Sequence, residues 1–353
     1  MTEGRAVQGH IARMAGYVPG EQPRDGGFTK LNTNENPYPP SPRVLEAIAR
    51  ALDDRLRLYP DPVGHAFRVA AARLHGVEPA NILCGNGSDD LLTIVTRACA
   101  GPGDVVVYPT PSYILYRTLA ELQAARPVEV PFEADWSLDP ARFAVPGARL
   151  AFLANPNSPS GTALRPDAVG RLARALDCPL VVDEAYVSFA DSDCVGLVAE
   201  HPNVIVLRTL SKGYSLAGLR FGYGIARPEL VEEFIKVKDS YNCDTLSLVG
   251  ATAAIEDRDY QAETRAKVLA TRRRLTQAMR EFGYDVPDSQ ANFVWCTGGP
   301  AAAPVYEALK ARKILVRLMR YPGHADGLRI TVGTDAEIDR LLEALGEILG
   351  NGR

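Results

Sequence analysis

The chain has 353 residues, 46% of them hydrophobic and 23% charged, with a formal net charge of -4 at pH 7. A chain of this length exceeds what one hydrophobic core usually supports, so two domains are expected. The charge favours neither a nucleic acid nor a membrane surface as partner. The sequence also contains neither a secretory signal pattern nor the ~20-residue apolar run that spans a bilayer, so we expect a cytoplasmic protein.

The N-terminal segment, residues 1–40, is rich in glycine and proline and is predicted to form an irregular arm. Helix and strand patterns then alternate through residues 41–259. Helices are predicted near residues 89–100, 112–123 and 167–176, and strands near 104–109, 126–131, 149–156, 179–185 and 203–209. This alternation predicts an α/β domain with a mostly parallel, mixed sheet between helices. Ligands of such sheets bind at the carboxyl ends of the strands.

The last part of the chain, residues 260–353, has a different pattern. A long charged helix is predicted near residues 259–283, followed by short strands near 292–296, 314–317 and 328–333. An amphipathic helix near residues 335–349 closes the chain. These elements predict a smaller α+β domain.

The six cysteines are scattered along the chain. They form no C-x-x-C pair and are not grouped with histidines at zinc-ligand spacing. Free cysteines are commonly small buried side chains. We therefore expect neither a disulfide nor a metal.

The stretch "VIVLRTLSKGYSLAGLRFGYG", residues 204–224, places three cations directly after a buried strand. Arg208, Lys212 and Arg220 would be costly at such a position unless an anion or an electrophile is bound there. The nearby Ser211 adds a neutral hydrogen-bonding group. These residues mark the end of this strand as a candidate binding site.

Three further polar motifs follow predicted strands. "CGNGSDDLL" places Ser88 and Asp89 at a helix start, which is either a simple cap or an anion site. "NPNSPSG", residues 155–161, is a polar turn directly after an apolar strand, which by itself is simply a proline-fixed loop. "VVDEAY" ends a strand with Asp183, a carboxylate that needs a partner. An imine-forming lysine, an acid that can hold a protonated ring nitrogen and a phosphate cradle together are what pyridoxal 5′-phosphate requires.

The order of the motifs G-N-G-S-D, P-S-Y, N-P-N-x-P-x-G, D-E-A-Y, T-L-S-K and G-L-R-x-G-Y resembles fold-type I pyridoxal-phosphate-dependent aminotransferases. Within that family the chain is similar to the histidinol-phosphate branch over nearly its whole length. The resemblance implies transamination between L-histidinol phosphate and 2-oxoglutarate, as a step of histidine biosynthesis.

The resemblance also implies a role for individual residues. Lys212 would form the Schiff base and act as general base and acid, and Asp183 would pair with the ring nitrogen. The other cofactor contacts implied are Asn157 and Tyr186 at the ring hydroxyl, Tyr113 on the ring face, and Ser88, Asp89, Ser211 and Arg220 at the phosphate. The substrate contacts implied are Tyr17, Asn157, Arg317 and Arg329. Tyr59 would reach the cofactor phosphate of a neighbouring subunit, which implies a homodimer.

Other functions are compatible with the same scaffold. An aromatic amino-acid aminotransferase would use the same arginines for a carboxylate. A phosphothreonine-type decarboxylase would use the same cofactor for another reaction. The sensor half of a transcription regulator would need a fused DNA-binding domain, for which the arm is too short. Assembly beyond the dimer stays open.

Overall fold

The computed structural model describes residues 6–16, 20–23 and 26–350. Its largest feature is a seven-stranded sheet in the order β2-β8-β7-β6-β5-β3-β4. The strands are β2 (Ile82–Gly85), β3 (Val105–Thr110), β4 (Arg126–Pro131), β5 (Ala148–Ala154), β6 (Leu180–Asp183), β7 (Val204–Thr209) and β8 (Gly222–Ile225). The strands from β4 to β7 run parallel, whereas β8 is antiparallel to both β7 and β2.

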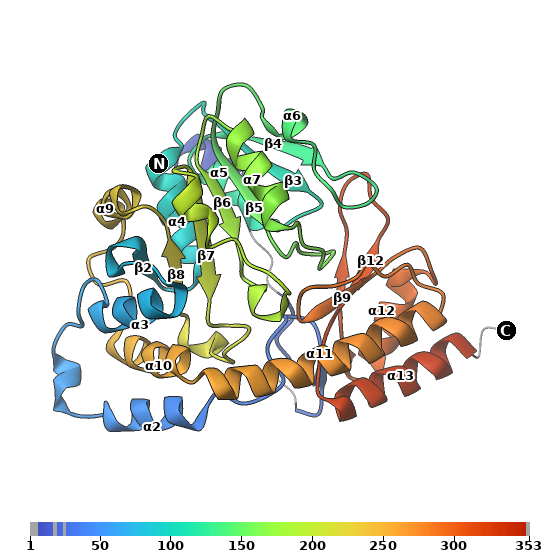
Figure 1. Cartoon of the computed structure of the whole chain (residues 1–353). Helices are drawn as coiled ribbons and strands as arrows, with labels where there is room; N and C mark the ends of the chain where they lie inside the picture. The colour runs from blue at the N-terminus through green and yellow to red at the C-terminus, as the bar shows by residue number, and fades with distance from the viewer. Residues whose placement is uncertain (1–5, 17–19, 24–25, 351–353) are drawn as a thin grey trace.

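Helices lie on both sides of this sheet (Figure 1). They are α2 (Pro42–Arg50), α3 (His65–His75), α4 (Ser88–Cys99), α5 (Leu115–Leu122), α6 (Pro140–Phe143), α7 (Pro166–Ala175), α8 (Leu197–Glu200), α9 (Pro228–Val237) and α10 (Thr245–Glu256), with short 3-10 turns η1 (Asp54–Arg57), η2 (Pro79–Asn81), η3 (Val187–Phe189) and η4 (Ala217–Leu219). Successive strand residues enter different apolar clusters: Val181 belongs to one and Val182 to the other. A strand that is buried on both faces explains the continuous apolar runs in the sequence.

The C-terminal elements form a second, smaller body beside the large sheet (Figure 1). They are α11 (Arg258–Glu281), β9 (Phe293–Cys296), α12 (Ala302–Ala311), β10 (Ile314–Leu315), β11 (Arg317–Met319), β12 (Gly327–Thr331) and α13 (Asp335–Gly350). The antiparallel sheet β11-β12-β9 packs its apolar side chains with those of the helices into a separate core. The long helix α11 starts beside α10 and continues into this body.

The N-terminal arm is less irregular than expected. It contains a short helix, α1 (Gly9–Arg13), and a two-residue strand, β1 (Thr29–Lys30). Strand β1 pairs in parallel with β10 of the smaller body, where Leu31 enters the core. Within the described ranges, no helix is long and apolar enough to cross a membrane.

The expected fold class is confirmed: a large mixed sheet between helices, with a smaller C-terminal body built on an antiparallel sheet. The single strand predicted near residues 314–317 is divided in the structure. Residues Ile314 and Leu315 pair with the arm, whereas Arg317 begins a strand that pairs with β12. The domain limits at residues 40 and 259 stay a prediction.

Candidate active site

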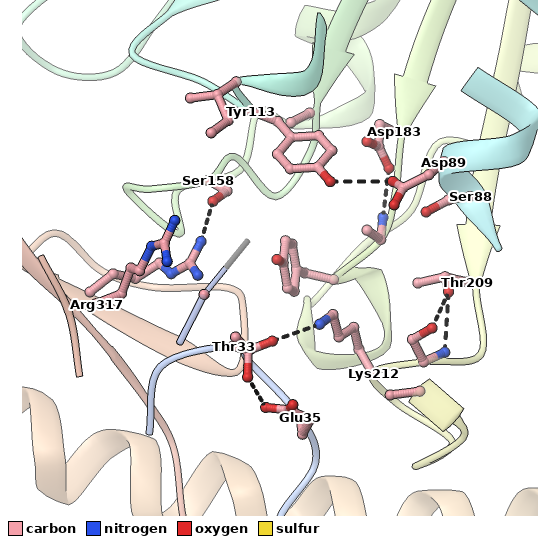
Figure 2. Close-up of a pocket in the computed structure, with 18 of the residues that line it drawn as sticks. Thr33, Glu35, Ser88, Asp89, Tyr113, Ser158, Asp183, Thr209, Lys212 and Arg317 are labelled. Atoms are coloured by element: carbon pink, nitrogen blue, oxygen red, sulfur yellow. Dashed lines mark hydrogen bonds between the residues drawn. The ribbon is translucent and has the colours of Figure 1, made fainter. Parts of the chain in front are cut away.

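A cavity of about 260 Å³ lies at the carboxyl ends of β5, β6 and β7. The arm and strands β11 and β12 close its other sides, as Figure 2 shows. The residues that line it and were expected from the sequence are Ser88, Asp89, Tyr113, Asp183, Tyr186, Ser211, Lys212, Arg220, Arg317 and Arg329. The structure therefore brings together most of the predicted site residues from widely separated parts of the chain.

Lys212 lies just beyond the end of β7 and points into the cavity (Figure 2). Its Nζ donates a hydrogen bond to the Thr33 carbonyl oxygen at 3.0 Å. Burial lowers the pKa of the Lys212 amine to about 8, and the Glu35 carboxylate opposes this shift. With this pKa about a tenth of the amines are neutral at pH 7, far more than for an ordinary lysine, so Lys212 can act as a nucleophile or a base.

Asp183 is the last residue of β6 and is 4% exposed. Its carboxylate accepts hydrogen bonds from the Tyr116 hydroxyl at 2.9 Å and from the Ala185 amide at 3.2 Å, both of them neutral donors. Burial raises the pKa of Asp183 to about 7, although the bond from Tyr116 acts in the opposite direction. A buried carboxylate in this state would be stabilised by a cation placed in the cavity.

The N-terminus of α4 forms a cradle with the loop after β7. Ser88 starts the helix, and Arg220 Nη1 lies 3.4 Å from the Ser211 hydroxyl oxygen. Gly87 has a φ of 87°, and a Cβ there would lie 2.7 Å from Arg220 Nη2. Glycine therefore allows the guanidinium to approach the helix start. A helix N-terminus, a hydroxyl and a guanidinium together make a site suited to phosphate.

Two tyrosines lie on different sides of the cavity. The Tyr113 hydroxyl donates to Asp89 Oδ1 at 3.3 Å, and its ring contacts the buried Tyr116 ring edge-on. The Tyr186 hydroxyl accepts a hydrogen bond from Asn34 at 3.0 Å. The Tyr186 ring also lies 5.9 Å from Lys212 Nζ, measured to its centroid.

Arg317 and Arg329 are direct partners in the antiparallel pairing of β11 with β12. Their side chains therefore extend from the same face of the sheet into the cavity. Arg329 donates to the Ser158 hydroxyl at 3.0 Å and to the Asn32 carbonyl at 3.2 Å, while its Nε is buried without a partner among the described residues. Like charges placed opposite each other are destabilising, so an anion is the natural ligand here.

Asn157, expected at the ring hydroxyl and at the substrate, is not among the residues that line the cavity, and its role stays a prediction. Its side-chain amide donates to the Pro111 carbonyl at 3.1 Å and to the Ser160 hydroxyl at 2.9 Å, and its oxygen accepts from Ser112 at 2.9 Å. It therefore fastens two loops together behind the cavity wall. The next residue, Ser158, lines the cavity and contacts Arg329.

Tyr59 and Arg208, also singled out in the sequence, do not line the cavity. Tyr17 lies outside the described residues. Tyr59 is on the surface, 80% exposed, and stacks on Tyr241 with ring centroids 4.4 Å apart. Arg208 does not line the cavity; it forms an ion pair with the buried Glu184 at 2.8 Å.

Sequence reasoning missed several residues of this site. Tyr116, which holds Asp183, comes three residues after Tyr113 at the start of α5, and this closeness in sequence was the available signal. Ser158 belongs to the motif "NPNSPSG", which predicts a polar loop but not which of its side chains faces the cavity. Thr33 and Glu35 come from the arm, and nothing in their local sequence indicates that they meet Lys212.

Residues 27–345 match the model of the family described as aminotransferase class I and II. The chain belongs to this family. It is 48% identical over 333 residues to the histidinol-phosphate aminotransferase of Rhodopirellula baltica, covering 93% of this chain and 92% of the relative. It is 49% identical over 343 residues to histidinol-phosphate aminotransferase 1 of Nostoc sp., covering 96% and 97%. The aminotransferase resemblance expected from the motifs is confirmed.

Solved structures of this family have the same fold. The crystal structure of histidinol-phosphate aminotransferase from Sinorhizobium meliloti, in complex with pyridoxal 5′-phosphate, superposes with a TM-score of 0.85 at 31% identity. The match covers 92% of this aminotransferase chain and 91% of that one. A Thermus thermophilus aspartate aminotransferase double mutant gives a TM-score of 0.80 at 22% identity, over 91% of each chain, a likeness of fold alone.

Proposed function

We propose that this aminotransferase uses pyridoxal 5′-phosphate to exchange L-histidinol phosphate and 2-oxoglutarate for imidazole-acetol phosphate and glutamate, as a step of histidine biosynthesis. The observation that carries the proposal is the pair Arg317 and Arg329, which extend side by side into the cavity that holds Lys212. Two guanidinium groups suit a phosphate ester in one half-reaction and a carboxylate in the other. The names and high identity of the relatives support the same substrate.

The described residues fit the cofactor. Asp183 is a buried carboxylate whose partners are neutral, so a protonated ring nitrogen would supply the cation that it lacks. The cradle of Ser88, Ser211 and Arg220 would hold the phosphate. Bound there, the cofactor supplies an electron sink for the bonds of the amino carbon.

The protein's own residues would move and place the proton. With an amine pKa of about 8, Lys212 can accept a proton and return it within the cavity. Asp183 would keep the proton on the ring nitrogen. Tyr186 and Ser158 would donate hydrogen bonds to polar groups of the bound molecules, since both line the cavity. The Arg317–Arg329 pair would fix the anionic end of the substrate, which aligns the reacting carbon.

The test is a steady-state comparison of L-histidinol phosphate, phenylalanine, tyrosine and phosphothreonine, with 2-oxoglutarate as amino acceptor where one is needed. We expect the highest kcat/KM for histidinol phosphate. A higher value for phenylalanine or tyrosine would assign an aromatic aminotransferase instead. Release of carbon dioxide from phosphothreonine, with no glutamate formed, would assign a decarboxylase.

The proposed reaction uses 2-oxoglutarate and glutamate, metabolites of the cytoplasm, and we place the enzyme in that compartment.

We further propose that the enzyme works as a homodimer. The segment between α2 and α3 lies far from the smaller body in Figure 1. Its Tyr59 is exposed and stacks on Tyr241. Leu45 on α2 and three leucines in the segment that follows it, Leu52, Leu56 and Leu58, are also exposed. A groove lined by α2, α3 and α10 adjoins this surface. Clustered exposed apolar groups of this kind are typical of an interface.

A complementation experiment tests the dimer. In a two-fold dimer each Tyr59 would serve the partner's cavity, so Lys212→Ala and Tyr59→Asp chains should restore one intact site per heterodimer when mixed. We expect each variant to be inactive alone, because the Tyr59→Asp carboxylate would repel the cofactor phosphate. Full activity of a species that sediments as a monomer would refute the proposal.

A further inference from the structure

A polar cluster on the arm borders the cavity beside Lys212. It consists of Lys30, Thr33 and Glu35, and Glu35 lines the cavity. The Glu35 carboxylate forms an ion pair with Lys30 and accepts a hydrogen bond from the Thr33 hydroxyl. The Lys30 amine also donates to the Thr33 hydroxyl. The three side chains therefore hold one another in place.

This cluster contacts the catalytic lysine through the backbone of its middle residue. Lys212 Nζ donates to the Thr33 carbonyl oxygen at 3.0 Å, and Figure 2 shows the Thr33 hydroxyl directed to Glu35 on the other side. The side-chain amide of Asn36, also on the arm, donates to the Lys212 carbonyl oxygen at 3.1 Å. The arm thus holds both the amine and the main chain of Lys212.

The charges that face Lys212 come from several elements. Glu35 on the arm and Asp89 on α4 favour its protonated form, whereas Arg329 on β12 and Arg220 after η4 disfavour it. The Tyr186 ring lies against the amine. Glu35 itself faces Lys30 and Lys212: burial alone would raise the pKa of Glu35, but the bonds from Lys30 and Thr33 lower it. Glu35 is therefore ionised near neutral pH. The positive charge of Lys30 offsets part of the effect of this carboxylate on Lys212.

We propose that Glu35 and Lys30 form a positioning pair, which holds the Thr33 carbonyl against Lys212 and controls how readily the amine releases its proton. The two members act with opposite sign: Glu35 favours the protonated amine, and Lys30 limits this effect. The inference rests on the proposed function, because Lys212 is the base of transamination and the pair would adjust its protonation.

The test measures the protonation of Lys212 in three variants: Glu35→Gln, Lys30→Met and the double variant. In cofactor-free protein, the pH dependence of Lys212 acylation by an amine-selective reagent is followed by peptide mass spectrometry. In the holoenzyme, the pH midpoint of the absorbance change of bound pyridoxal 5′-phosphate gives a second, activity-independent readout. We expect the midpoint to fall by about 0.5–1 pH unit in Glu35→Gln and to rise by a comparable amount in Lys30→Met.

The opposite signs separate this role from a structural one. If the pair only shaped the arm, both single variants would shift the pH midpoint of Lys212 in the same direction. The double variant would then show the largest shift. We expect instead that the double variant returns close to the wild-type midpoint and that Glu35→Asp retains most of the Glu35 effect. The exposed pair Glu263 and Lys267 on α11 supplies matched controls, Glu263→Gln and Lys267→Met, which should leave the midpoint unchanged.

Two results would overturn the inference: equal midpoints in all variants, or shifts of one sign in both single variants. Failure of the proposed function is recognised separately. It would appear as absence of pyridoxal 5′-phosphate absorbance, or as lack of turnover with histidinol phosphate in the wild type. The acylation midpoint of Lys212 stays measurable in either case.

Discussion

The two ends of the active-site cavity are built in different ways. The cofactor wall, formed by Ser88, Asp183, Ser211 and Lys212, extends from neighbouring parts of one sheet and the helix that packs on it. The anion wall, formed by Ser158, Arg317 and Arg329, combines a loop after β5 with two strands of the smaller body. The sheet backbone fixes the first wall, whereas the second depends on how two bodies and the arm meet. Substitutions in the two walls should therefore have different effects on kcat, on KM and on cofactor binding.

The largest effect is expected at the centre of the cofactor wall. Lys212→Ala should lower kcat by on the order of 10⁴-fold or more with every substrate, because it removes both the nucleophile and the base. The fold should stay intact, since the surrounding strand ends are held by the sheet. Stopped-flow and steady-state assays measure the loss, with Lys267→Ala on the exposed face of α11 as control. Sustained multiple turnover without an added amine would contradict the assignment.

Asp183→Asn should reduce kcat by about 10- to 100-fold, since an amide stabilises a protonated ring nitrogen less well than a carboxylate. The same variant should change the pH dependence of stability in the cofactor-free protein. Burial raises the pKa of Asp183 from 3.8 to about 7, so the folded chain retains a proton that the unfolded chain releases. The free energy of unfolding should therefore fall as pH rises from about 4 to 7.

Thermal unfolding at several pH values checks this second effect. The cofactor-free wild type should lose stability across that range, and Asp183→Asn should remove this part of the loss. A rate reduction of less than tenfold would mean that Asp183 is not the partner of the ring nitrogen. An unchanged pH profile of stability would mean that its carboxylate is ionised in the folded chain.

The same difference between the walls explains what could be predicted from the sequence. Asp183 ends one apolar strand and Lys212 follows the end of another by three residues, and parallel strands bring their carboxyl ends to one edge. The sequence pattern of each strand therefore predicts that Lys212 and Asp183 lie at the same edge of the sheet. Five of the seven strands, β3 to β7, were predicted from such patterns, whereas β2 and β8 were not predicted.

The anion wall was harder to predict because it depends on loop geometry and on contacts between distant segments. The motif "NPNSPSG" indicated a polar loop, but not which of its side chains would face the cavity. The structure directs Asn157 into the loop and Ser158 into the cavity. The contact of Thr33 with Lys212 joins residues 179 positions apart, and local sequence carries no signal for it.

Lysine substitutions in the anion wall should show its dependence on a planar guanidinium. Arg329→Lys should raise KM for histidinol phosphate by about 10- to 100-fold, because lysine cannot bind the anion in bidentate form or keep the contacts to Ser158 and Asn32. Arg317→Lys should have a smaller effect. Bound cofactor should be retained in both. Arg320→Lys, at an exposed arginine paired with Asp326, is the matched control.

These variants would contradict the division into two walls if they released the cofactor or lowered kcat while leaving KM unchanged. That result would place the arginines in the cofactor site. Equal losses for histidinol phosphate and for glutamate are expected if both anions bind at the same pair, as proposed. A loss confined to glutamate would restrict the arginines to the carboxylate.

The smallest expected effect distinguishes two adjacent residues of one loop. Ser158→Ala removes one hydrogen-bond acceptor of Arg329, worth about 0.5–1.5 kcal/mol, so KM for histidinol phosphate should rise about 2- to 10-fold with little change in Tm. Asn157→Ala instead removes three buried hydrogen bonds, two to a neighbouring loop and one within its own, and it should lower Tm and weaken cofactor retention. Differential scanning calorimetry and kinetics on both variants make the comparison. If Asn157→Ala affected only KM and Ser158→Ala only Tm, the orientation of this loop would be the reverse of that described. Asn157 would then face the bound molecules, as the family resemblance implies.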